Sequence, residues 1–238
     1  MKINVIKPVA HVMHVTPDAE TFLEQCGRTC YKSEDRITSG SADRFVKMIC
    51  RNHHESVLEH ASMTARVICS RACTHQLVRH RLGSYSQESQ RYVNYRKKGY
   101  EVICPPSWKV PVGEYDMDQT GGYDGHGWSW RRGGPWTKEN SSISDRLGWL
   151  AYAFEAYEEE WESKSDRSKP EDARYFLPNA AKTEVVVTYN FRTWRHVFKE
   201  RALNSHAQWE IRSVMLGLMD DMVQLCPAVF GDLDNDKV

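Results

Sequence analysis

The helical periodicity of two long segments constrains the fold of this chain more than any other feature of its sequence. Apolar residues recur at intervals of three and four from Ile143 to Trp161, and again from Ile211 to Leu225, shortly before Pro227. This spacing places the apolar side chains on one face of an α-helix, and that face must be buried. We therefore expect two long helices that pack on a core.

Segments with strand character lie far apart in the sequence, with helical segments between them. Residues 2–6 and 184–190 are rich in β-branched side chains, and residues 63–70 alternate between two faces. Helical segments outnumber these scattered strands, so we predict an α+β fold. We expect a single domain over residues 1–238, with a mainly antiparallel central sheet flanked by helices.

Shorter helices are expected at four other places. Thr16 has the chemistry of an N-cap, and Pro17 suits the first helical position. A second helix is expected to start after Ser41. Ser70 could cap a short helix that leads into RHRLGSYSQESQRY, and a basic helix is expected after residue 190.

The segment 111–136 interrupts this pattern. Its sequence, PVGEYDMDQTGGYDGHGWSWRRGGPW, contains several glycines and three tryptophans, and it has neither a helical nor a strand period. Long segments of this kind are usually loops between elements. We predict a Gly/Trp-rich loop insertion at 111–136 rather than a separate domain.

The charge balance and the hydropathy disfavour several classes of protein. Lysine and arginine number 32 together, as do aspartate and glutamate, so no overall positive field would attract nucleic acid. The N-terminal residues lack the apolar core of a signal peptide, and no run of about 18 apolar residues would span a membrane. We therefore expect a cytoplasmic protein that binds neither nucleic acid nor membranes.

The cysteines and histidines do not form a recognisable metal site. None of the seven cysteines lies in a CxxC pair. HHESVLEH resembles the HExxH helix of zinc proteases, but His54 and His60 are six residues apart and not four. We predict no bound metal, while Ser56, Glu59 and His60 remain able to position a ligand through hydrogen bonds.

The segment RHRLGSYSQESQRY, residues 79–92, has two interpretations. It contains three arginines, three serines and two tyrosines. It could be a solvated turn with scattered ion pairs, or a loop that binds anions through guanidinium groups and hydroxyls. The chain lacks the GxGxxG and Walker A motifs that cradle phosphates, so a nucleotide would have to be held by side chains.

Two other segments concentrate arginine. Arg174 lies in ARYFLP, and the basic segment after residue 190 carries Arg192, Arg195, His196 and Arg201. In a chain without net charge, three separate arginine-rich segments indicate that they converge on one polyanionic site.

The spacing within the polar segment resembles the RHR-x7-S signature of the flavin-dependent thymidylate synthases, with Arg79, Arg81 and Ser89 at the defining positions. Other blocks of that family occur in the same order, namely HHESVLEH, RYFLP, NFR and RALNSHAQWEI. The resemblance covers about residues 45–105 and 170–228. It favours the ligand-binding interpretation of the polar segment.

The resemblance assigns residues to a cofactor and a substrate, position by position. The residues implied to bind FAD are Ser56, Arg79, His80, Arg81, Gln87, Asn190, Arg192 and His196. Those implied to bind dUMP are Gln76, Arg79, Gln87, Glu88, Ser89, Gln90, Arg91, Arg174 and Arg201. Three of the FAD positions differ from those of some members, because Ser56 stands where several have threonine, Gln87 where some have an acidic residue and His196 where others have asparagine.

The family implies a reductive methylation that converts dUMP to dTMP. The methylene group comes from 5,10-methylenetetrahydrofolate, and FADH2, reduced by NADPH, supplies the hydride. A homotetramer with sites shared between subunits is also implied. We expect Arg201 to be catalytic, because a fixed guanidinium would stabilise the negative charge that develops at N3 and O4 of the uracil as its C5 atom reacts.

Several roles remain open from sequence. Ser89 could attack the uracil, but no partner base is evident, so we interpret it as a residue that positions dUMP. No cysteine has the Pro-Cys-Gln setting of classical thymidylate synthases, and none is expected to be catalytic. Trp128, Trp130 or Trp136 could cap the entrance for folate or nicotinamide, or the segment could be a tolerated surface insertion.

Two other functions compete with methyl transfer. A flavoprotein that only oxidises NADPH would keep the cofactor residues and lose the transfer reaction. A module for single-stranded nucleic acid, built from arginines and aromatics, would bind oligonucleotides with a steep salt dependence. The zero net charge disfavours this second alternative.

Overall fold

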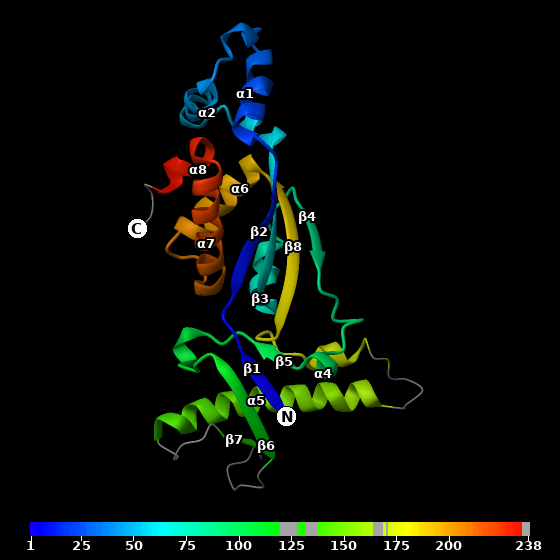
Figure 1. The fold of residues 1–238 in the computed structure, drawn as a ribbon. Helices are drawn as coiled ribbons and strands as arrows, with labels where there is room; N and C mark the ends of the chain where they lie inside the picture. Colours follow the sequence, from blue (N-terminus) through cyan, green and yellow to red (C-terminus); the bar gives the residue numbers. More distant parts are fainter. Residues whose placement is uncertain (120–127, 132–137, 164–168, 170, 235–238) are drawn as a thin grey trace. The chain divides into compact units, whose positions relative to one another are not determined.

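The structure, a computed structural model, describes residues 1–119, 128–131, 138–163, 169 and 171–234 (Figure 1). Its strands are β1 (Lys2–Val5), β2 (Val9–Val15), β3 (Ser62–Ser70), β4 (Ser84–Gln87), β5 (Tyr100–Val102), β6 (Gly113–Gln119), β7 (Trp128–Arg131) and β8 (Lys182–Asn190). Its α-helices are α1 (Ala19–Thr29), α2 (Ser41–Arg51), α3 (Arg71–Leu77), α4 (Tyr95–Lys98), α5 (Lys138–Glu162), α6 (Phe191–Phe198), α7 (Trp209–Leu225) and α8 (Pro227–Asp234). The 3₁₀ turns are η1 (Glu34–Arg36), η2 (Glu55–His60), η3 (Pro106–Trp108) and η4 (Ala173–Phe176), and η5 (Lys199–Leu203) is a π-helical turn.

Antiparallel strand pairs and flanking helices confirm the predicted α+β fold. The two periodic segments form α5 and α7, as expected. The strands predicted at residues 2–6, 63–70 and 184–190 are β1, β3 and β8. Within the described residues, no helix combines the length and the apolar character needed to cross a lipid bilayer.

The chain divides into two compact units, each with its own core. The first unit comprises Met1–Lys7, Cys69–Ala72 and Gln87–Thr183. The second unit comprises Pro8–Ile68, Cys73–Ser86 and Glu184–Val238. The described strands of the chain form two four-stranded sheets, whereas the sequence predicted one central sheet.

In the first unit, α5 packs on a sheet with the strand order β5-β1-β6-β7. β1 pairs in parallel with β5 and antiparallel with β6, which pairs antiparallel with β7. Ile3 lies opposite Tyr115 in this register, and both are fully buried together with Phe154. The ring of Tyr100 stacks on Phe154 with 4.2 Å between centroids, so aromatic burial holds the helix to the sheet.

The loop predicted at 111–136 is wrong over two stretches, because β6 and β7 lie within it. Tyr115 and Met117 are buried, whereas Glu114 and Asp116 are exposed. This alternation is that of a strand with one face on a core, but the surrounding glycines obscured it in the sequence. Trp136 lies outside the described residues, as do the side chains of Trp128 and Trp130, which were considered as caps.

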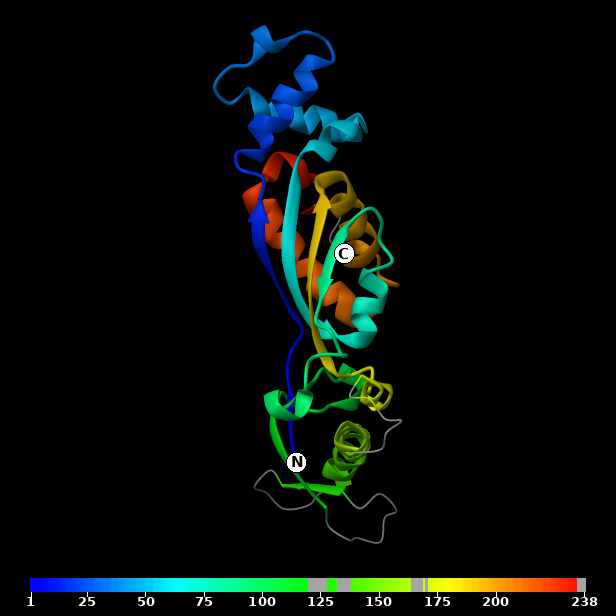
Figure 2. The ribbon, with the colours of Figure 1, turned by 90° about the vertical axis from the view of Figure 1, so that its right-hand side faces the viewer.

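In the second unit, the sheet order is β2-β3-β8-β4. Alternate residues of β8 are fully buried, among them Val187 and Tyr189. Figures 1 and 2 show α6 and α7 on one face of this sheet. Trp194 of α6 donates from Nε1 to the carbonyl of Met63 in β3 at 2.9 Å, which fixes the helix against the strands.

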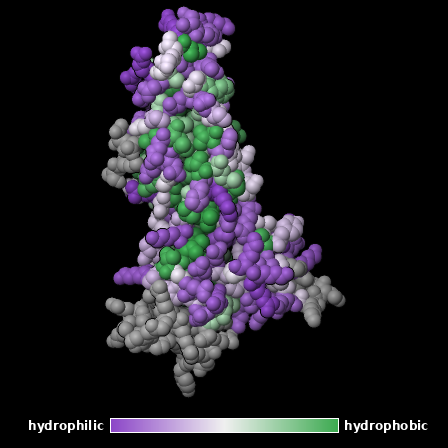
Figure 3. Space-filling model, viewed as in Figure 1, coloured by the Kyte–Doolittle hydropathy of each residue, from purple (hydrophilic) through white to green (hydrophobic). Residues whose placement is uncertain are grey.

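Both edge strands of this sheet escaped the sequence prediction. β2 leaves Met13 57% exposed and Val9 38% exposed, so its hydrophobic pattern does not separate two faces. β4 consists of small and polar residues, SYSQ. Hydrophobic residues gather over the region where β2 contacts α7 (Figure 3), and β2 is the outer strand there.

Two helix boundaries also differ from the prediction. Thr16 does not cap α1; its hydroxyl accepts from the backbone N–H of Ser62 at 2.9 Å and joins β2 to β3. The N-cap is Asp18 in a left-handed conformation. Pro227 ends the pattern of α7 as expected, but it also occupies the first position of α8, where its missing N–H costs nothing.

The buried side chain of Arg195 anchors α8 to α6. Its guanidinium forms two hydrogen bonds of 2.6 Å to the carboxylate of Asp232, and it also donates to the carbonyl of Val229. The Arg195 side chain is only 3% exposed, whereas Asp232 is 52% exposed. Partial burial opposes ionisation of Asp232, but hydrogen bonds and the charge of Arg195 outweigh it and lower the pKa of this carboxyl.

Asp232→Asn is expected to destabilise the fold by about 2 kcal/mol, because it leaves a buried guanidinium without its counter-ion. Since the pKa of Asp232 is lowered in the folded state, the stabilisation is complete at neutral pH and is lost as the pH falls through the folded pKa. Urea unfolding at pH 7 and at about pH 3 would measure both effects.

Asp43→Asn is the matched control, because Asp43 pairs with Lys47 at 2.7 Å on the exposed face of α2. Its loss is expected to cost less than about 0.5 kcal/mol. Equal losses for the two variants would contradict the role assigned to the buried guanidinium.

Candidate functional site

The RHR segment lies between α3 and β4. α3 ends at Leu77, and the chain turns through Arg79, His80 and Arg81 before β4 begins at Ser84. His80 is buried, whereas both arginines are exposed. The segment therefore presents two cations to solvent on either side of one buried imidazole.

The second unit has a polar cluster that consists of His80, Asn190, Arg192, His196 and Arg201. Its central contact joins His80 and Arg201. Nε of Arg201 donates to Nε2 of His80 at 2.9 Å, and the ring of His196 lies edge-on to His80 with 5.9 Å between centroids. Burial, the charge of Arg201 and the neighbouring His196 lower the pKa of His80 from 6.5 to about 4, and Glu200 opposes them. At neutral pH His80 is thus uncharged, which is the form that accepts a hydrogen bond at Nε2.

Arg201 lies on the π-helical turn η5, which directly continues α6. Such turns insert an extra residue into a helix and often occur at functional sites. Arg212 of α7 donates from Nε to the carbonyl of Ala202 at 3.2 Å and supports the turn. Sequence predicted one uninterrupted basic helix over this region, and no pattern in it signals the change of helix type.

α6 begins with a capping bond that positions three of the predicted residues. Oδ1 of Asn190 accepts from the backbone N–H of Thr193 at 2.8 Å, as an N-cap does. Within α6, Trp194 and Arg195 are buried, while Arg192 and His196 are exposed on one face, four residues apart. The cap and the helical period therefore place Asn190, Arg192 and His196 along the same side.

A hollow of about 500 Å³ lies along this side of α6. Its lining residues are Glu55, Glu59, Arg81, Leu82, Asn190, Arg192, Thr193, His196 and Lys199. Four residues implied to bind FAD are thus brought together. Nη1 of Arg192 donates to Glu59 at 2.6 Å, and Nε of Arg192 lies 3.6 Å from Glu55.

A second hollow, of about 640 Å³, adjoins the first, because Glu55 and Arg192 line both. Its lining is largely apolar and comes from α1, α2 and η2. The lining residues are Gly27, Cys30, Tyr31, Phe45, Met48, Ile49, His53, His54, Glu55, Ser56, Val57 and Arg192. Ser56, expected at the cofactor site, is an exposed residue of this lining.

Gln76 and Arg79 are the remaining predicted residues of the second unit. Nε2 of Gln76, in α3, is 3.5 Å from Oε1 of Gln208, which also caps α7. Arg79 lies three residues after Gln76 and is exposed. The contact between Gln76 and Gln208 joins the start of α7 to α3.

The first unit holds the other predicted substrate residues, namely Gln87, Glu88, Ser89, Gln90, Arg91 and Arg174. Ser89 starts a turn, because its hydroxyl accepts from the N–H of Arg91 at 3.3 Å. Glu88 lies 3.5 Å from Nζ of Lys182. The structure thus assigns the predicted substrate residues to both units and the FAD residues, except Gln87, to the second.

Glu171 is the carboxylate partner of Arg91 in the first unit. It accepts from Nε of Arg91 at 2.9 Å. The hydrogen bond and charge of Arg91, with smaller contributions from Lys169 and Arg174, lower the pKa of Glu171. The guanidinium of Arg174 lies 5.7 Å from the ring centroid of the exposed Tyr175, so a cation and an aromatic surface are presented together.

Sequence reasoning missed the carboxylates Glu55 and Glu171 and the cation Lys199, and it did not pair Glu59 with Arg192. Acidic residues are frequent in this chain, and nothing in their spacing signals a partner so distant in sequence. Only the folded chain brings each acid to its arginine.

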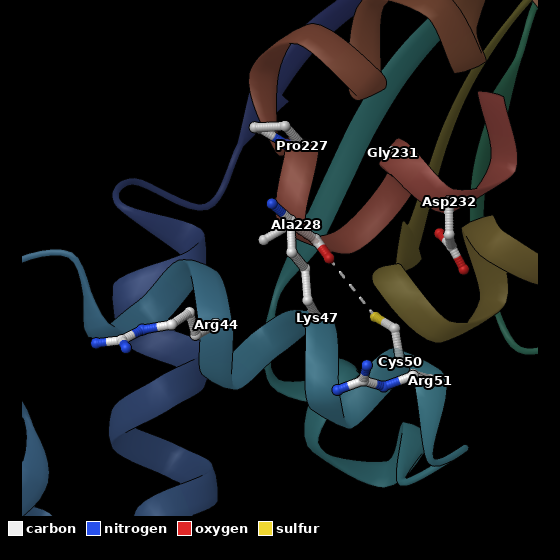
Figure 4. A pocket seen from close by; sticks show the side chains of 8 residues that line it. All are labelled: Arg44, Lys47, Cys50, Arg51, Pro227, Ala228, Gly231 and Asp232. Carbon is white, nitrogen blue, oxygen red and sulfur yellow. Dashed lines mark hydrogen bonds between the residues drawn. The ribbon is translucent and has the colours of Figure 1, made fainter. Parts of the chain in front are cut away.

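A third hollow, of about 810 Å³, lies between α2 and α8 (Figure 4). Burial raises the pKa of the Cys50 thiol to about 11, and the thiol approaches the carbonyl of Ala228 at 3.8 Å. Lys47 and Asp232 on its wall already have ion-pair partners. No residue predicted for the site, all of which the structure describes, lines this hollow.

Comparison with known proteins agrees with the sequence blocks. Residues 11–228 match the family described as thymidylate synthase complementing protein. The chain is 33% identical over 232 residues to a flavin-dependent thymidylate synthase of Geobacter sulfurreducens, covering 94% of this chain and 85% of that protein. It is 34% identical over 201 residues to the enzyme of that name from Pyrococcus furiosus, covering 83% and 69%.

A solved structure supports the fold. The UMP/dUMP methylase PolB from Streptomyces cacaoi, bound with 5-Br dUMP, superposes with a TM-score of 0.71 and covers 96% of this chain and 95% of that one. The two sequences are 22% identical, so the likeness concerns the fold.

His80→Gln is expected to reduce the acid sensitivity of the fold. Because the pKa of His80 is about 4 in the folded state and 6.5 otherwise, the unfolded state takes up a proton as the pH falls between these values. This costs the native protein up to about 3 kcal/mol at pH 4, which the variant would not lose. Urea unfolding at pH 7 and pH 4 would measure the difference.

The exposed His75 provides the control, since His75→Gln is expected to keep the acid dependence of the native protein. The same acid loss in the His80 variant as in the native chain would show that His80 is not held as a neutral group.

Proposed function

Since the chain belongs to the family of flavin-dependent thymidylate synthases, we propose that it converts dUMP to dTMP by reductive methylation. In this proposal FAD occupies the second unit's adjoining hollows, and the dUMP phosphate is bound by Arg91 and Arg174. The observation that carries it is the assembly of Arg81, Asn190, Arg192 and His196 around one hollow. These residues come from two separate segments of the sequence, and the resemblance implies that each of them binds the cofactor.

The donors around the two hollows suit a flavin dinucleotide. A pyrophosphate requires cations and N–H donors, which Arg81, Arg192 and Lys199 supply on the wall of the first hollow. An isoalloxazine or adenine ring requires a flat apolar surface, which Phe45 and Ile49 supply in the second. The two carboxylates of the first hollow reduce its positive charge but leave three cations against two acids.

The substrate phosphate would be held by Arg91 of the polar segment and by Arg174. Arg91 and Arg174 both carry permanent charge and lie near the same carboxylate, Glu171. An arriving phosphate would compete with that carboxylate for the guanidinium of Arg91. Ser89, whose hydroxyl and carbonyl organise the turn that contains Arg91, would position the substrate and not attack it.

Arg201 would act on the uracil ring. Its Nε is engaged by neutral His80, so its terminal nitrogens are fixed in direction and its positive charge is not cancelled by that partner. A fixed cation beside O4 and N3 stabilises the charge that develops when C5 becomes nucleophilic. Bound flavin, when reduced, would supply the hydride that completes the methyl group.

The proposal includes 5,10-methylenetetrahydrofolate as the methylene donor and NADPH as the reductant of the flavin. It also includes a homotetramer with shared sites, as in the family resemblance. The exposed edge of β2, with Met13 and Val9 on its surface, supports contact with another copy.

The proposed reaction predicts a yellow protein that forms dTMP. Purified protein supplied with FAD, dUMP, 5,10-methylenetetrahydrofolate and NADPH is expected to produce dTMP, tetrahydrofolate and NADP⁺ in equal amounts. A visible spectrum and product chromatography would measure both properties. NADPH consumption without dTMP would favour an oxidase, and a colourless protein that forms no dTMP would refute the proposal.

Arg201→Lys is expected to lower kcat by about 100-fold while FAD stays bound, because a lysine cannot reproduce the fixed direction of the guanidinium. Steady-state kinetics and the flavin spectrum would separate the two effects. Arg51→Lys, an exposed change on α2, is the control and should keep native kcat. Near-native turnover of the Arg201 variant would mean that the activating charge lies elsewhere.

A further inference from the structure

Two tyrosine hydroxyls meet behind the RHR segment. Tyr189 of β8 is 1% exposed, and its hydroxyl is hydrogen-bonded to that of Tyr85 in β4. Tyr85 donates to the carbonyl of His80, and Tyr189 lies within 3.2 Å of the carbonyl of Leu77. The two hydroxyls therefore hold the carbonyl of Leu77, at the end of α3, and that of His80, three residues later.

This pair holds His80 through its backbone. The N–H of His80 donates to Leu77 at 3.1 Å, and its carbonyl accepts from Tyr85, so both of its backbone polar groups are fixed. With the backbone fixed, the imidazole meets Arg201 at 2.9 Å. A continuous series of hydrogen bonds thus runs from β8 through β4 to the π-helical turn.

Gly83 makes room for this arrangement. A Cβ atom at position 83 would lie 2.1 Å from Cε1 of Tyr189 and 3.2 Å from the backbone carbonyl of Thr188. Real carbon atoms do not approach so closely, and the ring cannot move, because it packs edge-on against Trp194 with 4.7 Å between centroids. The ring of Tyr189 therefore fits only because position 83 has no side chain.

We propose that Tyr189, together with Tyr85 and Gly83, forms a positioning device that sets His80 and, through it, the guanidinium of Arg201. The importance of that guanidinium for turnover rests on the proposed function, whereas the placement of His80 does not. None of these three residues was assigned to cofactor or substrate from the sequence. Tyr189 and Tyr85 are positioning residues, because they act through His80.

The charged surroundings of His80 provide a direct readout. Burial, Arg201 and His196 lower the pKa of its imidazole, and Glu200 opposes them. Loss of the hydroxyls would let the segment relax away from Arg201 toward solvent. The pKa of His80 should then rise from about 4 toward 6.5.

The test compares Tyr85→Phe and Tyr189→Phe with the native protein. Both substitutions keep the rings, and the first removes the direct bond to His80. NMR titration of His80 is expected to show a raised pKa in both variants, more in Tyr85→Phe. In the methylation assay, kcat should fall about tenfold with less change in the KM for dUMP, as for a displaced catalytic group.

Tyr115→Phe is the matched control, because the Tyr115 hydroxyl donates to the carbonyl of Pro111 at 2.6 Å in the first unit's core. It removes a comparable bond and should lower Tm by a similar amount. The pKa of His80 and kcat should remain native. If the Tyr85 and Tyr189 variants also leave the His80 pKa unchanged, the positioning role is refuted.

The glycine is tested by rescue. Gly83→Ala should lower Tm by several degrees, and adding Tyr189→Val should recover most of that loss, because the smaller side chain opens the space. The double variant should still show a raised His80 pKa, since the hydroxyl is absent. Additive losses of Tm would overturn the packing argument. The Tm and the pKa of His80 can both be measured without turnover. A native protein that forms no dTMP would therefore refute the proposed function but would leave the positioning role of the tyrosines to be decided by these two measurements.

Discussion

Burial of one face of β8 against α6 determines where the groups of the second unit's polar cluster lie. The alternation along β8 buries Tyr189 and leaves Asn190 at the strand end, where it caps α6. Once α6 starts there, its period sends Trp194 and Arg195 into the core and leaves Arg192 on the hollow. The same helix continues into the turn that carries Arg201. Hydrophobic burial, the largest favourable term in folding, thus fixes the polar groups indirectly.

The electrostatics of the cluster depend on keeping one group neutral. A protonated imidazole at His80 would place a second positive charge against Arg201 and would remove the acceptor at Nε2. Burial prevents this, so the guanidinium gains an ordered neighbour without losing its charge. The arrangement differs from that of Arg192 and Arg91, whose carboxylate partners offset their charge.

Patterns that depend on burial could be predicted from the sequence, and those that depend on distant partners could not. α5, α7, β3 and β8 follow from their apolar periods, because each presents one face to a core. β2 and β4 lie at sheet edges with little apolar contrast, and β6 was hidden by neighbouring glycines. The resemblance supplied the residues expected at the site, and four of them line one hollow. The acids Glu55 and Glu171 and the tyrosine pair had no local signal, since their roles exist only through partners from other elements.

The close contact between Gly83 and Tyr189 has an evolutionary consequence. The two positions are far apart in the chain, yet position 83 cannot gain a side chain while tyrosine occupies position 189, because the new Cβ would clash with the ring. A descendant that acquires a side chain at position 83 would have to accept a smaller residue at position 189, and would then give up a hydroxyl behind His80. The order of mutations is constrained as well, because shrinking position 189 first opens space, whereas filling position 83 first creates a clash. Lineages could therefore cross between the two packings in one direction more easily than in the other.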